Sequence, residues 1–191
     1  MRAEAGFLYA LILGALAGLG LTWFAASDRL ALGALQIGPW SARPMAYDED
    51  ADRYARARLA RSGDLPLASG EGIAFVATTD SAGAPLEGRC AYRIAPILPP
   101  ARWWTLTLYD EGGRLIVNPA GRNGFTSAEI LRQSADEATV DISQAVQPGN
   151  WLPSAAGPLI LTLRLYDSPI STGLGTKDTV SLPAIERVRC S

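Results

Sequence analysis

PARWWTLTLYDEGGRL, Pro100 to Leu115, joins two tryptophans to a strict alternation of Thr and Leu and then breaks at an Asp-Glu-Gly-Gly turn. A second segment, Thr162 to Asp167, repeats the Thr-Leu-x-Leu-Tyr-Asp pattern of Thr105 to Asp110. Successive side chains of a β-strand point to opposite faces of its sheet. Each segment therefore has one purely apolar face, which predicts two strands that line a core.

The two predicted faces of these strands differ in chemistry. The core faces consist of Trp104, Leu106 and Leu108 in the first strand, and Leu159, Leu161, Leu163 and Leu165 in the second. The opposite faces carry Trp103, Tyr109, Arg164 and Tyr166 beside threonines. Because aromatic residues such as Tyr and Trp combine an apolar body with a polar tip, we interpret these four as a candidate ligand-binding surface. The alternative is the outer side of a sheet that the charged helix or a loop covers.

Short runs separated by Gly, Pro, Asn and Asp extend from this region in both directions. We predict strands at 73–79, 89–95, 103–110, 114–117, 139–142 and 158–166, with a short helix at 127–133. This spacing is typical of a mainly β fold, here an antiparallel, jelly-roll-like β sandwich. The predicted organisation is an anchor at 1–27, a juxtamembrane segment with a charged helix at 28–63, and the β domain at 64–191.

The charged helix is predicted from Asp48 to Arg61, with acidic residues in its first turn and arginines later. This order suits the helix dipole, and Glu49–Arg53 and Asp52–Arg56 are favourable i,i+4 pairs. We interpret it as a solvated, self-paired helix; binding of its arginines to an anionic partner is the alternative.

FLYALILGALAGLGLTWFAA, Phe7 to Ala26, is a run of 20 residues without a charge. About 20 helical residues span the hydrocarbon core of a bilayer, so we predict a single transmembrane anchor. The alternative is a cleaved signal peptide, with a small-residue site at 24–27. Arg2 in the short preceding tail favours a cytoplasmic N-terminus, which puts the rest of the chain outside the inner membrane. Trp23 and Trp40 are expected at the membrane interface.

Small residues recur every fourth position along this segment, and this spacing places them on one stripe of the helix. The stripe consists of Gly6, Ala10, Gly14, Gly18 and Thr22. Small residues let a second helix approach closely, so we expect packing against another membrane protein or a second copy of this chain. The alternative is that Gly and Ala are simply frequent in membrane spans.

Cys90 and Cys190 lie 100 residues apart. Outside the inner membrane such a pair is expected to form a disulfide; two unpaired thiols are the alternative. The chain has no histidine, which excludes Ser-His and Cys-His nucleophiles, and two cysteines alone cannot build a structural zinc site. We predict no catalytic residue, cofactor or metal, and the net charge of −2 does not favour nucleic-acid binding.

Four motifs follow one another along the β domain: an aromatic-rich strand at 103–110, Asn118-Pro119, the Asn-Trp-Leu-Pro turn at 150–153, and a Leu-Arg-Leu-Tyr strand at 163–166. Together they resemble the bacterial domain-of-unknown-function family twelve-fourteen. The resemblance covers residues 54–188 and implies a jelly-roll-like β domain with no established catalytic residues. Its members often carry a second β domain, and we expect this chain to lack it. The resemblance thus implies the small membrane-anchored branch and a separately encoded sister protein as partner.

These features together predict a non-catalytic role. The leading hypothesis is a single-pass inner-membrane protein whose periplasmic β domain is a partner or accessory subunit of an envelope complex. The alternative is a glycan-binding or glycan-processing β sandwich that uses the face of Trp103, Tyr109, Arg164 and Tyr166.

Overall fold

The computed structural model describes residues 2–25, 34–43, 53–62, 67, 70–97, 99, 101–133, 138–170 and 181–190. Contacts divide the chain into two compact units. The first comprises Met1–Gly33 with Met45–Pro66 and contains helices α1 (Arg2–Ala25) and α2 (Arg53–Ser62). The second comprises Ala34–Pro44 with Leu67–Ser191 and contains every described strand.

Helix α1 has the length and composition of a membrane span. Ala5–Phe24 has a mean hydropathy of 1.9, and none of its side chains is buried against protein. A signal sequence near an N-terminus shares these properties. Helix α2 is confirmed from Arg53 onward; the predicted acidic first turn, and with it the pairs of Glu49 and Asp52, lies outside the described residues.

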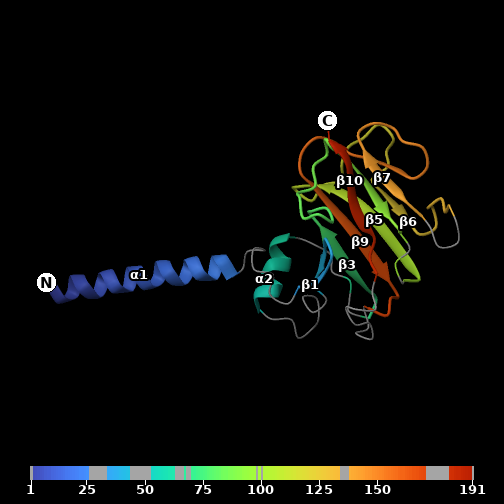
Figure 1. Cartoon of the computed structure of the whole chain (residues 1–191). Helices are drawn as coiled ribbons and strands as arrows, with labels where there is room; N and C mark the ends of the chain where they lie inside the picture. The colour runs from blue at the N-terminus through green and yellow to red at the C-terminus, as the bar shows by residue number, and fades with distance from the viewer. Residues whose placement is uncertain are drawn as a thin grey trace. The chain divides into compact units, whose positions relative to one another are not determined.

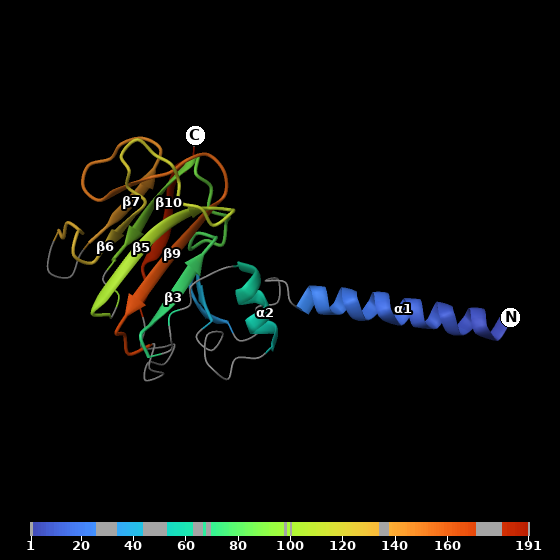
Figure 2. The ribbon, with the colours of Figure 1, turned by 180° about the vertical axis from the view of Figure 1, so that it is seen from behind.

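The second unit is built from two β-sheets (Figures 1 and 2). The six-stranded sheet has the order β1-β2-β3-β9-β5-β6, with all its pairs antiparallel. Its strands are β1 (Leu35–Ile37), β2 (Trp40–Ala42), β3 (Gly72–Ala77), β9 (Leu159–Tyr166), β5 (Trp103–Asp110) and β6 (Gly124–Thr126).

The four-stranded sheet has the order β10-β4-β7-β8. Its strands are β10 (Ala184–Cys190), β4 (Cys90–Ala95), β7 (Val140–Ser143) and β8 (Trp151–Pro153). Only the last pair, β7 with β8, is parallel among the described strand pairs. Buried side chains of both sheets form one hydrophobic cluster, which confirms a β sandwich with mainly antiparallel sheets. The jelly-roll strand order stays a prediction.

The two strands with the repeated sequence pattern are hydrogen-bonded neighbours at the centre of the larger sheet. Leu106 lies opposite Leu163, and Trp104 lies opposite Leu165. All seven predicted core residues of β5 and β9 are at most 3% exposed. The alternation of side chains therefore predicts both the strands and the faces that they bury.

The hairpin of β1 and β2 extends this sheet in a way that the sequence analysis did not predict. Trp40 was expected at a membrane interface, but it is completely buried in the core. Its Nε1 donates a hydrogen bond of 2.7 Å to the carbonyl oxygen of Pro183. A buried indole N–H needs such a partner, and this one is 143 residues away. A contact that distant leaves no local sequence signal.

Two predicted elements are wrong. The segment 114–117 is not a strand; a single bridge joins Leu115 to Tyr109 after the turn at Asp110. The Asp110 carboxylate accepts a hydrogen bond from Arg114 N and stabilises this turn, beyond which Val117 is almost fully exposed. The segment 127–133 forms turns rather than a helix, because the side chain of Asn150 takes both backbone groups of Leu131.

The predicted disulfide between Cys90 and Cys190 is present and joins the outer strand β10 to β4. It closes a loop with a sequence separation of 100 residues. Two more bonds hold the same strand, because Ile185 N donates to Ser81 Oγ and Ser81 N donates to Ile185 O. The C-terminal strand is therefore fixed covalently at one end and by hydrogen bonds at the other.

We predict that the double variant Cys90→Ala, Cys190→Ala loses about 2–4 kcal/mol of unfolding free energy, because the cross-link constrains the unfolded chain. Urea denaturation of the full chain in detergent measures this loss. Reduction with dithiothreitol is the control: it should lower the stability of the wild type and leave the double variant unchanged. Equal stability of wild type and variant would contradict the prediction.

Candidate functional site

The four residues of the predicted ligand-binding surface lie on the outer face of the six-stranded sheet. Trp103 pairs directly with Tyr166 across β5 and β9. The side chain of Trp103 is 52% exposed, whereas Tyr109, Arg164 and Tyr166 are partly buried. Pairing across the strands therefore gives an aromatic pair at one end of this face.

Arg164 and Tyr109 form the other half of the surface. A guanidinium nitrogen of Arg164 donates a hydrogen bond of 3.2 Å to Tyr109 Oη, and the guanidinium carbon lies 5.9 Å from the ring centroid. Tyr109 pairs with Ile160, which is four residues from Arg164 along β9, about 13 Å at the usual rise per residue. The two side chains must therefore lean toward each other over Thr162, which explains why Thr162 is only 6% exposed on an outer face.

The surface thus consists of one cross-strand aromatic pair and one hydrogen-bonded pair, and not of four converging groups. Glycan processing would need two carboxylates facing one cleft, commonly about 5–10 Å apart. None of these four residues carries a carboxylate. A hollow on the outer face of the four-stranded sheet has Asp141 as its one acidic lining residue. Glycan binding by the aromatic pair stays a prediction.

Asn150 of the Asn-Trp-Leu-Pro motif has a structural role that reaches beyond its own turn. Its amide accepts from Leu131 N and donates to Leu131 O and Thr139 O, at 2.8–2.9 Å. The motif was interpreted as a turn, but the partners of Asn150 are 19 and 11 residues away. Asn118, by contrast, bonds locally, to Ile116 O and to both backbone groups of Arg122. Both motifs therefore order loops around the core.

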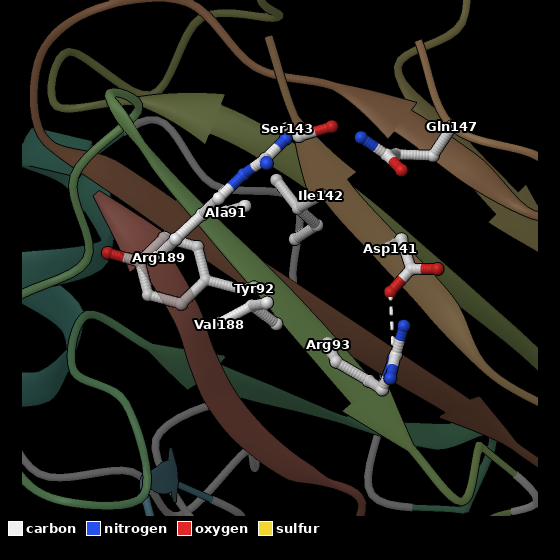
Figure 3. Close-up of a pocket in the computed structure, with 9 residues that line it drawn as sticks. All are labelled: Ala91, Tyr92, Arg93, Asp141, Ile142, Ser143, Gln147, Val188 and Arg189. Atoms are coloured by element: carbon white, nitrogen blue, oxygen red, sulfur yellow. Dashed lines mark hydrogen bonds and ion pairs between the residues drawn. The ribbon is translucent and has the colours of Figure 1, made fainter. Parts of the chain in front are cut away.

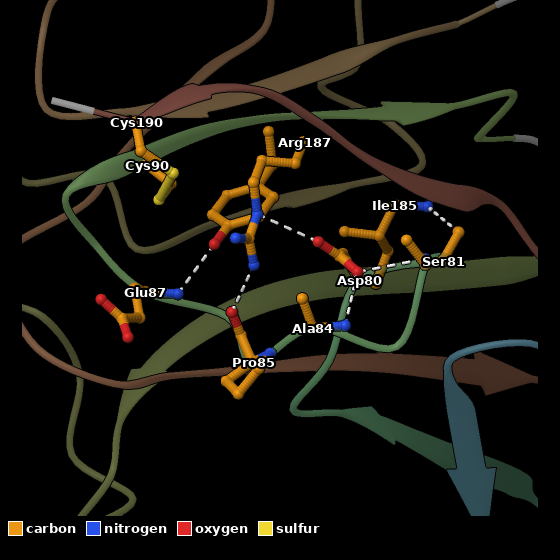
Figure 4. A network of polar contacts seen from close by, with 11 residues as sticks. Asp80, Ser81, Ala84, Pro85, Glu87, Cys90, Ile185, Arg187 and Cys190 are labelled. Atoms are coloured by element: carbon orange, nitrogen blue, oxygen red, sulfur yellow. Dashed lines mark hydrogen bonds and ion pairs between the residues drawn. A yellow bond between two sulfur atoms is a disulfide. The ribbon is translucent and has the colours of Figure 1, made fainter.

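A polar network that no sequence motif indicated joins the 80–87 loop to β10 (Figure 4). Asp80 is 3% exposed, and its carboxylate accepts hydrogen bonds from Ala82 N and Ala84 N at 3.0 and 2.9 Å. Arg187 Nε lies 3.0 Å from the other carboxylate oxygen. A buried carboxylate needs such partners, and this set satisfies it. Only the Asp-Ser-Ala-Gly turn was visible in the sequence, because Arg187 lies over 100 residues away.

Arg187 itself makes two further contacts. Its Nη2 donates to Pro85 O at 2.7 Å, and its guanidinium carbon lies 5.7 Å from the centroid of the Tyr92 ring. Tyr92 Oη in turn accepts a hydrogen bond from Glu87 N at 2.8 Å. Arg187 therefore links the loop, β4 and β10, and its contacts are those of a structural residue.

The outer face of the four-stranded sheet contains a hollow of about 200 Å³ (Figure 3). Its polar lining comprises Arg93, Asp141, Ser143, Gln147 and Arg189. Arg93 pairs with Asp141 through a bond of 3.0 Å between Nε and Oδ1. The strands alternate small and charged residues here, but no sequence motif indicated that they meet. Within the described ranges, no group of three or more His, Cys, Asp or Glu side chains could hold a metal ion.

Comparison with known proteins identifies the family. The chain matches the family described as "Protein of unknown function (DUF1214)" over residues 71–170. The chain belongs to this family. The match contains all four motifs that carried the resemblance, so the predicted membership in DUF1214 is confirmed. It is shorter at both ends than the resemblance had suggested, and α1 and α2 lie outside it.

Solved structures also resemble this member of DUF1214. The VPA0106 protein from Vibrio parahaemolyticus has 21% sequence identity and a TM-score of 0.59, over 73% of this chain and 36% of that chain. An uncharacterized protein from Burkholderia cenocepacia has 15% identity and a TM-score of 0.42, over 63% of this chain and 30% of that chain. The chain thus spans about a third of either protein, and the Vibrio structure shares its fold. A search of curated proteins finds no match.

We predict that Arg187→Gln lowers the unfolding free energy by about 1–3 kcal/mol, because it removes a charged partner from the buried carboxylate of Asp80. Urea denaturation of the full chain in detergent measures the change. Arg189→Gln is the matched control, since its side chain lies two residues along the same exposed strand and should change stability by less than about 0.5 kcal/mol. Equal effects of the two substitutions would contradict this role of Arg187.

Proposed function

We propose that the chain is a single-pass protein of the bacterial inner membrane with a cytoplasmic N-terminus. Its DUF1214 domain lies in the periplasm and acts as a non-catalytic accessory subunit of an envelope complex. Helix α1 is the anchor, and the β sandwich is the part that meets the partner.

The disulfide is the single observation that carries the location. Disulfides persist in oxidising compartments such as the periplasm and are rare in the cytosol. Cys90 and Cys190 are paired in the structure, and the bond ties the last described strand to the sheet. A domain built around this bond is suited to the exported side of the membrane, and Arg2 ahead of the span favours the same orientation.

The anchor is supported by the surroundings of α1. A helix that is apolar on all sides needs either a protein core or lipid around it. None of the side chains of Ala5–Phe24 is buried inside protein, so lipid is the environment that suits them. At its far end, the Arg61 guanidinium carbon lies 4.4 Å from the centroid of the Trp23 ring. A tryptophan and an arginine at this place fit the aromatic and polar boundary of a bilayer.

The partner role is supported by the small share of the Vibrio relative that this chain matches. The Vibrio relative devotes only 36% of its length to the region that this chain matches. A separately encoded sister protein that carries the remaining part is the partner we propose. The small-residue stripe on α1 is the proposed contact inside the membrane, with that protein, another membrane protein or a second copy of this chain.

Location is tested by labelling the two cysteines in intact cells. We expect an outer-membrane-permeable maleimide that does not cross the inner membrane to label Cys90 and Cys190 only after reduction, and the product to keep residues 1–27. Mass spectrometry of the purified protein detects both the maleimide label and the presence of residues 1–27. Labelling without reduction, or a mature chain that begins near Asp28, would contradict the proposed location or anchor respectively.

Helix packing is tested by Gly14→Leu and Gly18→Leu. An added Cβ at either position meets nothing within 4 Å, so we attribute a loss of partner to a lost contact with a neighbouring helix. We expect at least a fivefold loss of the partner recovered from mild detergent. Gly20→Leu is the matched control, because Gly20 also has free space and lies about 160° from Gly18 around the helix. Equal recovery for all three variants would contradict a contact through the stripe.

A further inference from the structure

The hollow on the four-stranded sheet arises from one small side chain between large ones. Arg189 on β10 lies opposite Ala91 on β4, and Arg93 on β4 lies opposite Asp141 on β7. Alternation along the strands puts these four side chains on the same outer face. Because Ala91 has only a methyl group, the sheet is hollowed there to about 200 Å³.

Hydrogen-bond donors around this hollow are left unused. Figure 3 shows the side chain of Arg189 reaching across Ala91 toward Ser143, and the amide of Gln147 on the opposite rim. Among the described residues, neither of these two side chains has a hydrogen bond or ion pair. Arg93 bonds Asp141 through Nε, and its terminal nitrogens make no further hydrogen bond within the described part of the chain.

The net charge of the lining residues determines which anion suits the hollow. Two guanidinium groups and one carboxylate leave a single positive charge among the lining residues. Glu186 lies opposite Arg93 but does not line the hollow. A guanidinium matches the geometry of a carboxylate and binds it with two parallel bonds. A phosphate dianion would carry an excess charge next to Asp141, whereas a carboxylate balances the single positive charge.

We propose that this hollow is a binding site for one carboxylate group. Arg189 binds the carboxylate, the terminal nitrogens of Arg93 supply the second set of donors, and the Gln147 amide donates from the rim. The carboxylate of Asp141 holds Arg93 in place by accepting a hydrogen bond from Arg93 Nε. The ligand is either a small free carboxylic acid or an acidic side chain of a protein, and the site does not depend on the membrane anchor or on a particular partner.

The test uses the full chain in detergent and follows the Nε–Hε signals of the arginine side chains by NMR. Sodium acetate is titrated at constant ionic strength, with acetamide as the uncharged control. We expect the signals of Arg93 and Arg189 to move saturably with acetate and to stay in place with acetamide. Arg114, whose side chain is 84% exposed at the turn that follows β5, reports on unspecific ion effects and should not saturate.

Two variants separate the site from general surface charge. Arg189→Gln should weaken acetate binding at least fivefold, while Arg114→Gln leaves it unchanged. Ala91→Leu fills the hollow without removing a charge and should abolish saturation at Arg93. Circular dichroism confirms that each variant is folded. Parallel, unsaturated shifts at all arginines, or unchanged binding by Ala91→Leu, would overturn the proposal.

Two further probes, a glutamate-containing peptide and methyl phosphate, distinguish the possible sources of the bound anion. Tighter binding of the peptide acetyl-Gly-Glu-Gly-amide than of acetate supports an acidic protein side chain as ligand. Binding of acetate at least as tight as that of the peptide supports a small free acid. Methyl phosphate at the same ionic strength distinguishes the anion class, and tighter binding of methyl phosphate than of either carboxylate would overturn the assignment.

Discussion

The pairing of β5 with β9 is the interaction on which the rest of the sandwich depends. The two strands are in register over eight residues, so that Leu106 lies against Leu163 and Leu108 against Leu161 on the inner face. Each buried leucine contributes about 1.5–3 kcal/mol, and both strands are flanked by further strands. The same register determines the outer face, because a shift by one residue would bury Arg164 and expose Leu163.

The second sheet closes the core from the other side, and its outer strand is held by means other than apolar burial. Five of the seven residues of β10 are exposed. The strand remains in place through the disulfide, the bonds of Ile185 to Ser81, and the ion pair of Arg187 with Asp80. Because these contacts fix β10, Arg189 keeps a defined position beside Ala91, and the outer hollow exists.

The two outer faces therefore differ in what they offer to a ligand. On the larger sheet, Arg164 is engaged by Tyr109, and the exposed group is the aromatic ring of Trp103. On the smaller sheet, Arg189 and Gln147 leave donors unused in a hollow. The accessory subunit that we propose needs a surface that meets its partner, and the smaller sheet provides a concave shape with unsatisfied charge. The larger sheet provides aromatic area.

The sequence by itself determined the apolar helix, the family, the sandwich and the buried faces of β5 and β9, since these follow from composition and from alternation along a strand. It also indicated the pairing of Cys90 with Cys190. Only the tertiary structure decided the burial of Trp40, the partners of Asn150, the Asp80–Arg187 network and the hollow around Ala91. Each of these depends on groups brought together from distant parts of the chain, and local periodicity contains no information about which strands become neighbours.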